Sequence, residues 1–227
     1  MGYENPAKFG ATLTLATSDL TPLEIREARF ASNPTEAGAA RMAAIRETKG
    51  EYAAAVEYYR QAGKLGGSSE RYAGEILMAQ AGGMRAKLFT FDDVKATADG
   101  ILASKPADHG DLLMTASLMT RLSRRQEKPE VAVPFLKTAV EATEGVTDPD
   151  LAAERNGLLV DHALLVLGDK DRAVSLKRAG MPEGWMEEAG GLNEFAWWCY
   201  ENKVNLEEAE ALARKGASLA PAGKERR

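Results

Sequence analysis

The sequence predicts an all-α protein in which about ten helices form five antiparallel pairs. The first observation is a triplet of mostly small residues that recurs with offsets of four and three. Four such triplets start at Ala55, Val94, Ala132 and Ala209, and a fifth, weaker copy of the repeat centres on Ala173, so that these five residues lie 39, 38, 41 and 36 positions apart. Spacings of this length are typical of repeated helix pairs. The second observation is composition, because alanine is abundant, only 7% of the 227 residues are aromatic, and small side chains let helices pack closely.

Capping residues, glycines and prolines divide the chain into these pairs. A single helix from Thr21 to the stop at Asn33-Pro34 comes first, because the residue before a proline disfavours the helical conformation. The five predicted pairs are 35–48 with 51–65, 70–84 with 91–104, 108–122 with 129–143, 151–167 with 170–179, and 193–201 with a last helix that starts at 206 and ends before Pro221.

In the first three pairs the turns set the boundaries. Lys49-Gly50 is the predicted turn of the first pair. The basic run Arg121–Lys128 is placed in the turn of the third pair and interpreted as a solvated loop. Pro134 lies near the start of the helix that follows, where a missing N–H is tolerated.

The last two pairs have clear start and stop signals. Asp148-Pro149 opens the fourth pair, and Asn205 is a predicted N-cap for the last helix, with acidic residues in the first turn. The glycine pair Gly190-Gly191 is predicted to lie between helices. Trp185, beside a Pro-Gly turn, is predicted to dock on neighbouring helices, because an exposed tryptophan is costly.

The last pair resembles a tetratricopeptide (TPR) repeat. The family pattern runs Trp-x2-Leu-Gly-x2-Tyr, then Ala-x3-Phe, then Pro. Tyr200, Ala209 and Pro221 stand at matching spacings, whereas Asn193 and Trp197 occupy the Trp and Gly places of the pattern. The resemblance implies a right-handed superhelix of helix pairs, a TPR-like α-solenoid, and the domain predicted on this basis spans residues 21–221.

Residues 1–20 do not follow the repeat pattern. A Gly-Tyr pair followed by a proline-started helix with Phe9 and Leu13 resembles the end of a thioredoxin-like domain. The catalytic CxxC and cis-proline loop of that family are absent, so no redox activity is carried over. A simple N-terminal capping helix explains the segment equally well. The compartment, cytoplasmic or periplasmic, depends on whether residues precede Met1, and residues 222–227 are a predicted charged tail.

The residues that usually carry catalysis or bind metals do not form a motif. His109 and His162 lie far apart and lack partners at metal-ligand spacing, so both are interpreted as structural or solvent-facing. Cys199 lies on a mostly apolar helix without a nearby base, which is typical of a buried thiol. We therefore expect no cofactor and no metal, and we expect that this chain as it stands is not an enzyme.

Net charge and hydropathy limit the classes of partner that are expected. The net charge of −5 argues against a nucleic-acid partner, which needs a basic face. No apolar stretch approaches the length of a membrane helix, so no membrane insertion is expected. Stacked helix pairs usually bind proteins or peptides, and the leading hypothesis is a non-catalytic protein-interaction scaffold. The alternative is a C-terminal accessory module of a larger thioredoxin-family redox protein, which would position its substrate or partner.

A contact patch follows from the helix register. The first helices of the pairs are predicted to line one concave face: 36–47, 70–84, 108–122, 150–167 and 193–201. The residues predicted to be buried between pairs are Tyr52, Tyr59, Trp197 and Leu212. Because adjacent helical residues point about 100° apart, packing of Trp197 leaves Trp198 facing the groove or the chain end. Glu194, Trp198 and Glu201 are therefore the predicted partner-binding residues. Equally, Trp198 could seal the array against residues 181–185.

Overall fold

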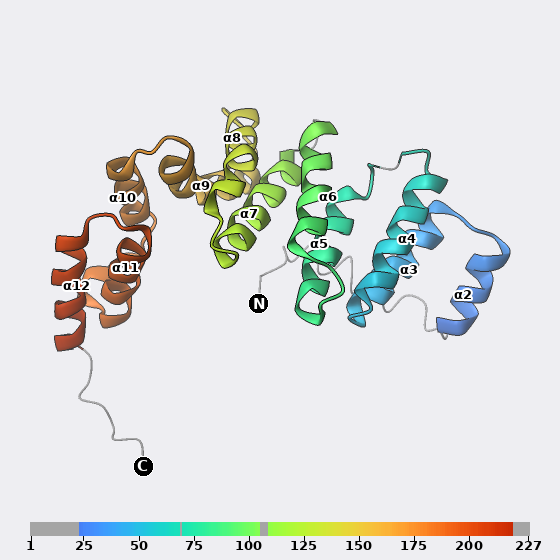
Figure 1. Ribbon diagram of the computed structural model, residues 1–227, viewed down its shortest axis with the longest axis horizontal. Coiled ribbons are helices and arrows are strands. Elements are labelled where there is room, and N and C mark those ends of the chain that lie inside the picture. Colours follow the sequence, from blue (N-terminus) through green and yellow to red (C-terminus); the bar gives the residue numbers. More distant parts are fainter. Residues whose placement is uncertain (1–22, 69, 105–108, 220–227) are drawn as a thin grey trace, which may run out of the picture. The chain divides into compact units, whose positions relative to one another are not determined.

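The computed structural model describes residues 23–68, 70–104 and 109–219, and every regular element in these ranges is helical (Figure 1). The all-α prediction is confirmed. The eleven α-helices of the described residues are α2 (Leu23–Ser32), α3 (Glu36–Thr48), α4 (Tyr52–Leu65), α5 (Ala73–Gly83), α6 (Phe91–Ser104), α7 (His109–Arg125), α8 (Val133–Ala142), α9 (Pro149–Asp161), α10 (Lys170–Ala179), α11 (Ala189–Asn202) and α12 (Leu206–Leu219).

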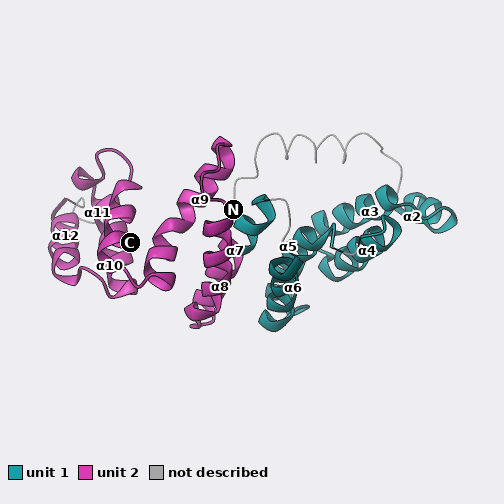
Figure 2. Cartoon of the chain, turned by 90° about the horizontal axis from the view of Figure 1, so that it is seen from above, with its two compact units in different colours: residues 1–115 teal, residues 116–227 magenta. Residues whose placement is uncertain are grey.

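The chain forms two compact units, residues 1–115 and residues 116–227, and the division falls within α7 (Figure 2). Each unit is described by itself. The predicted N-terminal segment, the charged tail and the Pro221 stop lie outside the described residues, so the thioredoxin-like resemblance of residues 1–20 stays a prediction.

In the first unit, α3 packs against α4, α4 against α5, and α5 against α6. The centre of this packing is Tyr59, which is 6% exposed, so its predicted burial is confirmed. The Tyr59 ring stacks on Tyr72 with 6.0 Å between centroids, and its hydroxyl donates to Glu47 at 3.0 Å. Tyr52 is only half-buried and lies over Gly82, where a Cβ atom would approach the ring to 2.6 Å.

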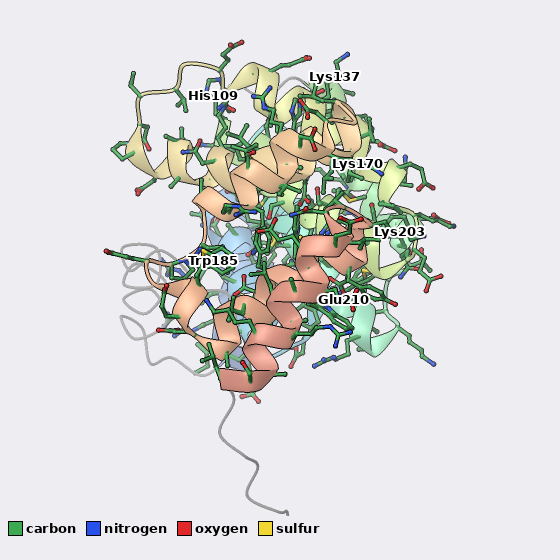
Figure 3. All side chains as sticks on the ribbon, turned by 90° about the vertical axis from the view of Figure 1, so that its left-hand side faces the viewer. His109, Lys137, Lys170, Trp185, Lys203 and Glu210 are labelled. Carbon is green, nitrogen blue, oxygen red and sulfur yellow. The ribbon has the colours of Figure 1, made fainter. Side chains whose placement is uncertain are left out.

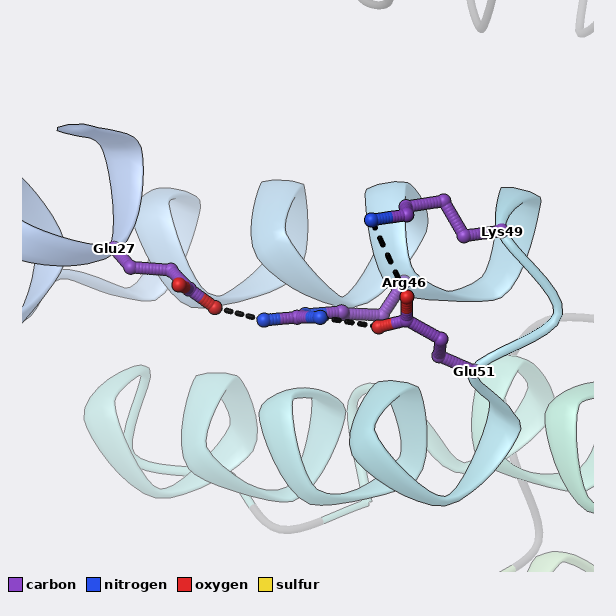
Figure 4. A network of polar contacts seen from close by, with 4 residues as sticks. All are labelled: Glu27, Arg46, Lys49 and Glu51. Carbon is purple, nitrogen blue, oxygen red and sulfur yellow. Dashed lines mark hydrogen bonds and ion pairs between the residues drawn. The ribbon is translucent and has the colours of Figure 1, made fainter. Parts of the chain in front are cut away.

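The Arg46 side chain links α2 to the turn between α3 and α4. Arg46 on α3 donates to Glu27 on α2 and to Glu51 before α4, and Lys49 lies 3.3 Å from the same Glu51 carboxylate (Figure 4). The hydrogen bond from Arg46 lowers the pKa of Glu51. Helix α2 has no fully buried residue. This charge network therefore helps to hold α2 against α3.

In the second unit, α11 packs against α12, and a cluster of buried apolar residues fills the space between them and α10. Phe195 is fully buried at its centre, with the Trp185 ring 4.9 Å and the Trp198 ring 6.1 Å away, measured between centroids. The predicted docking of Trp185 and burial of Leu212 are confirmed, because these residues are 8% and 7% exposed.

The predicted burial of Trp197 is wrong, because its side chain is 57% exposed. The buried stripe of α11 runs through Leu192, Phe195 and Cys199, at steps of three and four. Trp198 lies three residues after Phe195 and so borders this stripe, whereas Trp197 lies on the other side of the helix. The apolar stripe of α11 therefore determines which of its side chains are buried, and the TPR repeat pattern does not.

Several predicted boundaries are also wrong, and α5, for example, begins at Ala73 and not at residue 70. Helix α7 continues to Arg125, so the first half of the predicted solvated loop is helical. Helix α11 begins at Ala189, so the glycine pair 190–191 is inside the helix. Close packing explains the error at α11, because a Cβ atom on Gly191 would lie 2.6 Å from the Trp185 carbonyl oxygen. In addition, a 3-10 turn at 129–132 precedes α8, which places Pro134 in the first turn of that helix.

Candidate functional site

The three residues predicted to bind a partner do not form one open patch. Glu194 makes an ion pair with Lys177 of α10 at 2.7 Å, and Trp198 is half-buried against the Phe195 cluster. Glu201 is exposed. Trp198 packs on the cluster that contains Trp185, and Met181 packs on the same cluster, which is the arrangement expected of a sealing residue. A role of these three residues in partner binding stays a prediction.

The exposed aromatic side chains of α11 are instead Trp197 and Tyr200. They are 57% and 65% exposed, and their rings lie 5.6 Å apart between centroids. They border a groove of about 360 Å³ between α11 and α12. We call this surface the α11–α12 face; its other lining residues are Asn193, Ala196, Leu206, Ala209, Glu210 and Ala213.

Acidic residues lie in the lining of the α11–α12 face or next to it in the sequence: Glu210 lines the groove, and Glu201 and Glu207 follow the lining residues Tyr200 and Leu206. Glu210 on α12 forms an ion pair with Arg214 at 2.6 Å, and Lys203 lies in the turn before α12 (Figure 3). Glu201 and Glu207 are exposed and make no ion pair with any residue that the structure describes.

A second cavity of about 440 Å³ lies between α7 and α9, within the second unit. We call it the α7–α9 pocket; it is lined by Ser117, Thr120, Arg121, Arg124, Arg125, Glu154, Gly157, Leu158 and Asp161. Sequence reasoning missed it because the basic run was placed in a loop. The available signal was the spacing of the three arginines, which at i, i+3 and i+4 fall on one helical face.

Cys199 is fully buried, and burial is the main cause that raises the pKa of its thiol. The thiolate is the reactive form of cysteine. We therefore expect Ellman's reagent to leave the folded protein unmodified at neutral pH and to titrate one thiol after denaturation in guanidinium chloride. Rapid modification of the native protein would show that the helix pair α11–α12 opens easily.

The remaining candidate groups form no site in the described ranges. His162 begins a short π-helix, His162–Val166, that continues from α9, and burial is the main cause that lowers the pKa of its imidazole. Among residues 23–68, 70–104 and 109–219, no three His, Cys, Asp or Glu side chains are grouped so that they could hold a metal ion. No helix in the same ranges has the length and apolar character needed to cross a membrane.

Comparison with known proteins assigns the chain to no family. The chain matches no family model, no curated protein and no solved structure.

Proposed function

We propose that this protein is a non-catalytic interaction scaffold, a TPR-like α-solenoid of five helix pairs, and that its α11–α12 face binds a helix of a partner protein. The observation that carries the proposal is the exposure of Trp197 and Tyr200 side by side at one groove. Large aromatic side chains supply much of the binding energy in protein interfaces. Adjacent exposed aromatic residues are a recognised mark of an interaction site.

The choice of a helix as ligand comes from the repeat itself. The triplet Ala209, Ala213 and Gly216 on α12 has the offsets of the α4 triplet that contains Tyr59. In the first unit, Tyr59 contacts the next element along the chain, by stacking on Tyr72 just before α5. Ala213 holds the corresponding position on α12, and it lines the open groove. A groove between two helices accepts a third, amphipathic helix.

The edge charges define the ligand further. A helix that inserts leucine or methionine side chains between Trp197 and Leu206 would lie on the groove that Glu210 lines. Lysine or arginine at its flanks would complement Glu210 and the neighbouring residues Glu201 and Glu207, and complementary charge mainly adds specificity and association rate. The proposed partner segment is thus an amphipathic helix with a leucine-rich face and basic flanks.

The test uses a fluorescein-labelled, 14-residue leucine–lysine helical peptide and fluorescence anisotropy. We expect the double variant Trp197→Ala/Tyr200→Ala to bind it at least about tenfold more weakly than the native chain, as for interface anchors. Because both side chains are exposed, its free energy of unfolding should fall by less than about 1 kcal/mol.

Two controls make this result specific. Trp198→Ala removes the neighbouring, half-buried tryptophan and should lower stability while peptide affinity stays near the native value. A leucine–glutamate peptide of the same length should bind more weakly than the leucine–lysine peptide. Equal affinity of the native chain and the Trp197→Ala/Tyr200→Ala variant would refute the proposed surface.

A further inference from the structure

We propose that the α7–α9 pocket is a second binding site, which takes the carboxylate side chains of an acidic peptide segment. This inference does not depend on the α11–α12 face, because it concerns other residues and a ligand of opposite charge. Helix α7 presents three guanidinium groups to one cavity of about 440 Å³.

The three arginines are not held in the same way. Arg124 donates to the Asp161 carboxylate at 2.5 Å and to the Asn202 side-chain oxygen at 3.3 Å, which fixes it between α9 and α11. Arg121 and Arg125 are exposed, and neither has a hydrogen bond or ion pair from its side chain in the described parts of the chain. Each guanidinium therefore has a free planar fork, which matches the two oxygens of a carboxylate.

Helix stability does not explain this arrangement. Cations near a helix C-terminus interact well with the helix dipole, which accounts for one basic residue in the last turn. Arg121 and Arg125, however, are four residues apart, and like charges at this spacing destabilise a helix. The facing helix carries Gly157, where an added Cβ atom would meet nothing within 4 Å. The open space thus lies opposite the free guanidinium groups.

The charge balance favours a carboxylate. Three guanidinium groups against the carboxylates of Glu154 and Asp161 give the lining a net charge of 3 − 2 = +1. One carboxylate neutralises this charge, whereas a phosphate dianion exceeds it. The Asp161 side chain, which lines the pocket, is only 20% exposed, and burial raises the pKa of its carboxyl despite the opposing effect of Arg124. Electrostatic attraction is stronger in such surroundings than in bulk water.

The experiment measures binding of fluorescein-labelled octaglutamate by anisotropy at an ionic strength of about 0.15 M, where the Debye length is about 8 Å. We expect the double variant Arg121→Gln/Arg125→Gln to bind about tenfold more weakly, because it loses charge-assisted hydrogen bonds. The matched control is Arg60→Gln/Lys64→Gln, which removes two exposed cations at the same spacing from α4. It should leave the affinity within about twofold of the native value, since screened distant charges contribute little.

Three further variants distinguish binding in the pocket from general electrostatic attraction to the protein surface. Gly157→Leu should fill the pocket and abolish binding, whereas Gly100→Leu, at another helical glycine whose Cβ would meet nothing within 4 Å, should not. Glu154→Gln raises the net charge of the lining to +2 and should tighten binding by about threefold or more, as expected for a nearby exposed charge. Circular dichroism of each variant checks that the helices are retained.

The outcomes decide between the alternatives. Weaker binding in Arg121→Gln/Arg125→Gln and Gly157→Leu, with tighter binding in Glu154→Gln, supports the site. Absence of octaglutamate binding, or the same affinity in Gly157→Leu as in Gly100→Leu, would overturn it. Displacement of octaglutamate by inorganic phosphate at lower concentration than by acetate would overturn the assignment to a carboxylate. None of these measurements involves Trp197, so their outcome is independent of whether the α11–α12 face binds a helix.

Discussion

Replacing Phe195 with alanine should lower the free energy of unfolding of the second unit by about 3–5 kcal/mol. The Phe195 side chain is fully buried, between the rings of Trp185 and Trp198. The Arg178 guanidinium also lies 5.3 Å from its ring centroid. Truncation would leave a cavity at the centre of the cluster and remove all of these contacts. Urea denaturation followed by circular dichroism measures the effect.

Tyr200→Ala is the control for Phe195→Ala, because it truncates another aromatic residue of α11. Tyr200 is 65% exposed, and its replacement should cost less than about 1 kcal/mol. The packing described for α11 is incorrect if the Phe195 variant loses no more stability than the Tyr200 variant.

The adjacent glycines of α11 should respond in opposite directions to alanine. A Cβ atom on Gly191 would lie 2.6 Å from the Trp185 carbonyl oxygen, which is backbone and cannot rotate away. We therefore expect Gly191→Ala to lower the free energy of unfolding by about 1–3 kcal/mol, as overpacking usually does. A Cβ atom on Gly190 would meet nothing within 4 Å, so Gly190→Ala should raise stability by about 0.5 kcal/mol through better helix propensity.

Urea denaturation of the two variants side by side makes this comparison. Both substitutions change helix propensity in a similar way, so the difference between them isolates the contact with Trp185. Equal effects on stability would mean that the turn before α11 does not pack on the helix as described.

Local signals in the sequence were sufficient for several helices. The bounds of α6 and α10 are those predicted, 91–104 and 170–179. At α6, the Asp93 carboxylate accepts from the backbone N–H of Thr90 at 2.8 Å, and the Thr90 hydroxyl accepts from the Asp93 N–H at 3.2 Å. At α10, the Asp169 carboxylate accepts from the Arg172 N–H at 2.9 Å. Such caps lie within a few residues of the boundary, so a sequence pattern can reveal them.

Other features depended on residues distant in the sequence. The start of α11 could not be read locally, because Gly191 is helical through its close contact with Trp185, and a glycine pair otherwise indicates a break. Trp197 was assigned to the core by its place in a repeat pattern, whereas the stripe through Phe195 and Cys199 places it outside. The basic run that contains Arg121 and Arg125 is typical of a solvated loop. Nothing in that run indicates that α9 faces these arginines across a pocket.

The central claim, that the α11–α12 face binds an amphipathic helix, is tested most directly by the three tryptophan indole N–H signals. In a ¹⁵N-labelled sample each signal can be assigned by replacing Trp185, Trp197 or Trp198 with phenylalanine. Titration with the unlabelled leucine–lysine peptide should shift the Trp197 signal and leave that of the buried Trp185 in place. An unmoved Trp197 signal at peptide concentrations that saturate anisotropy, or an equal shift of the Trp185 signal, would contradict the claim.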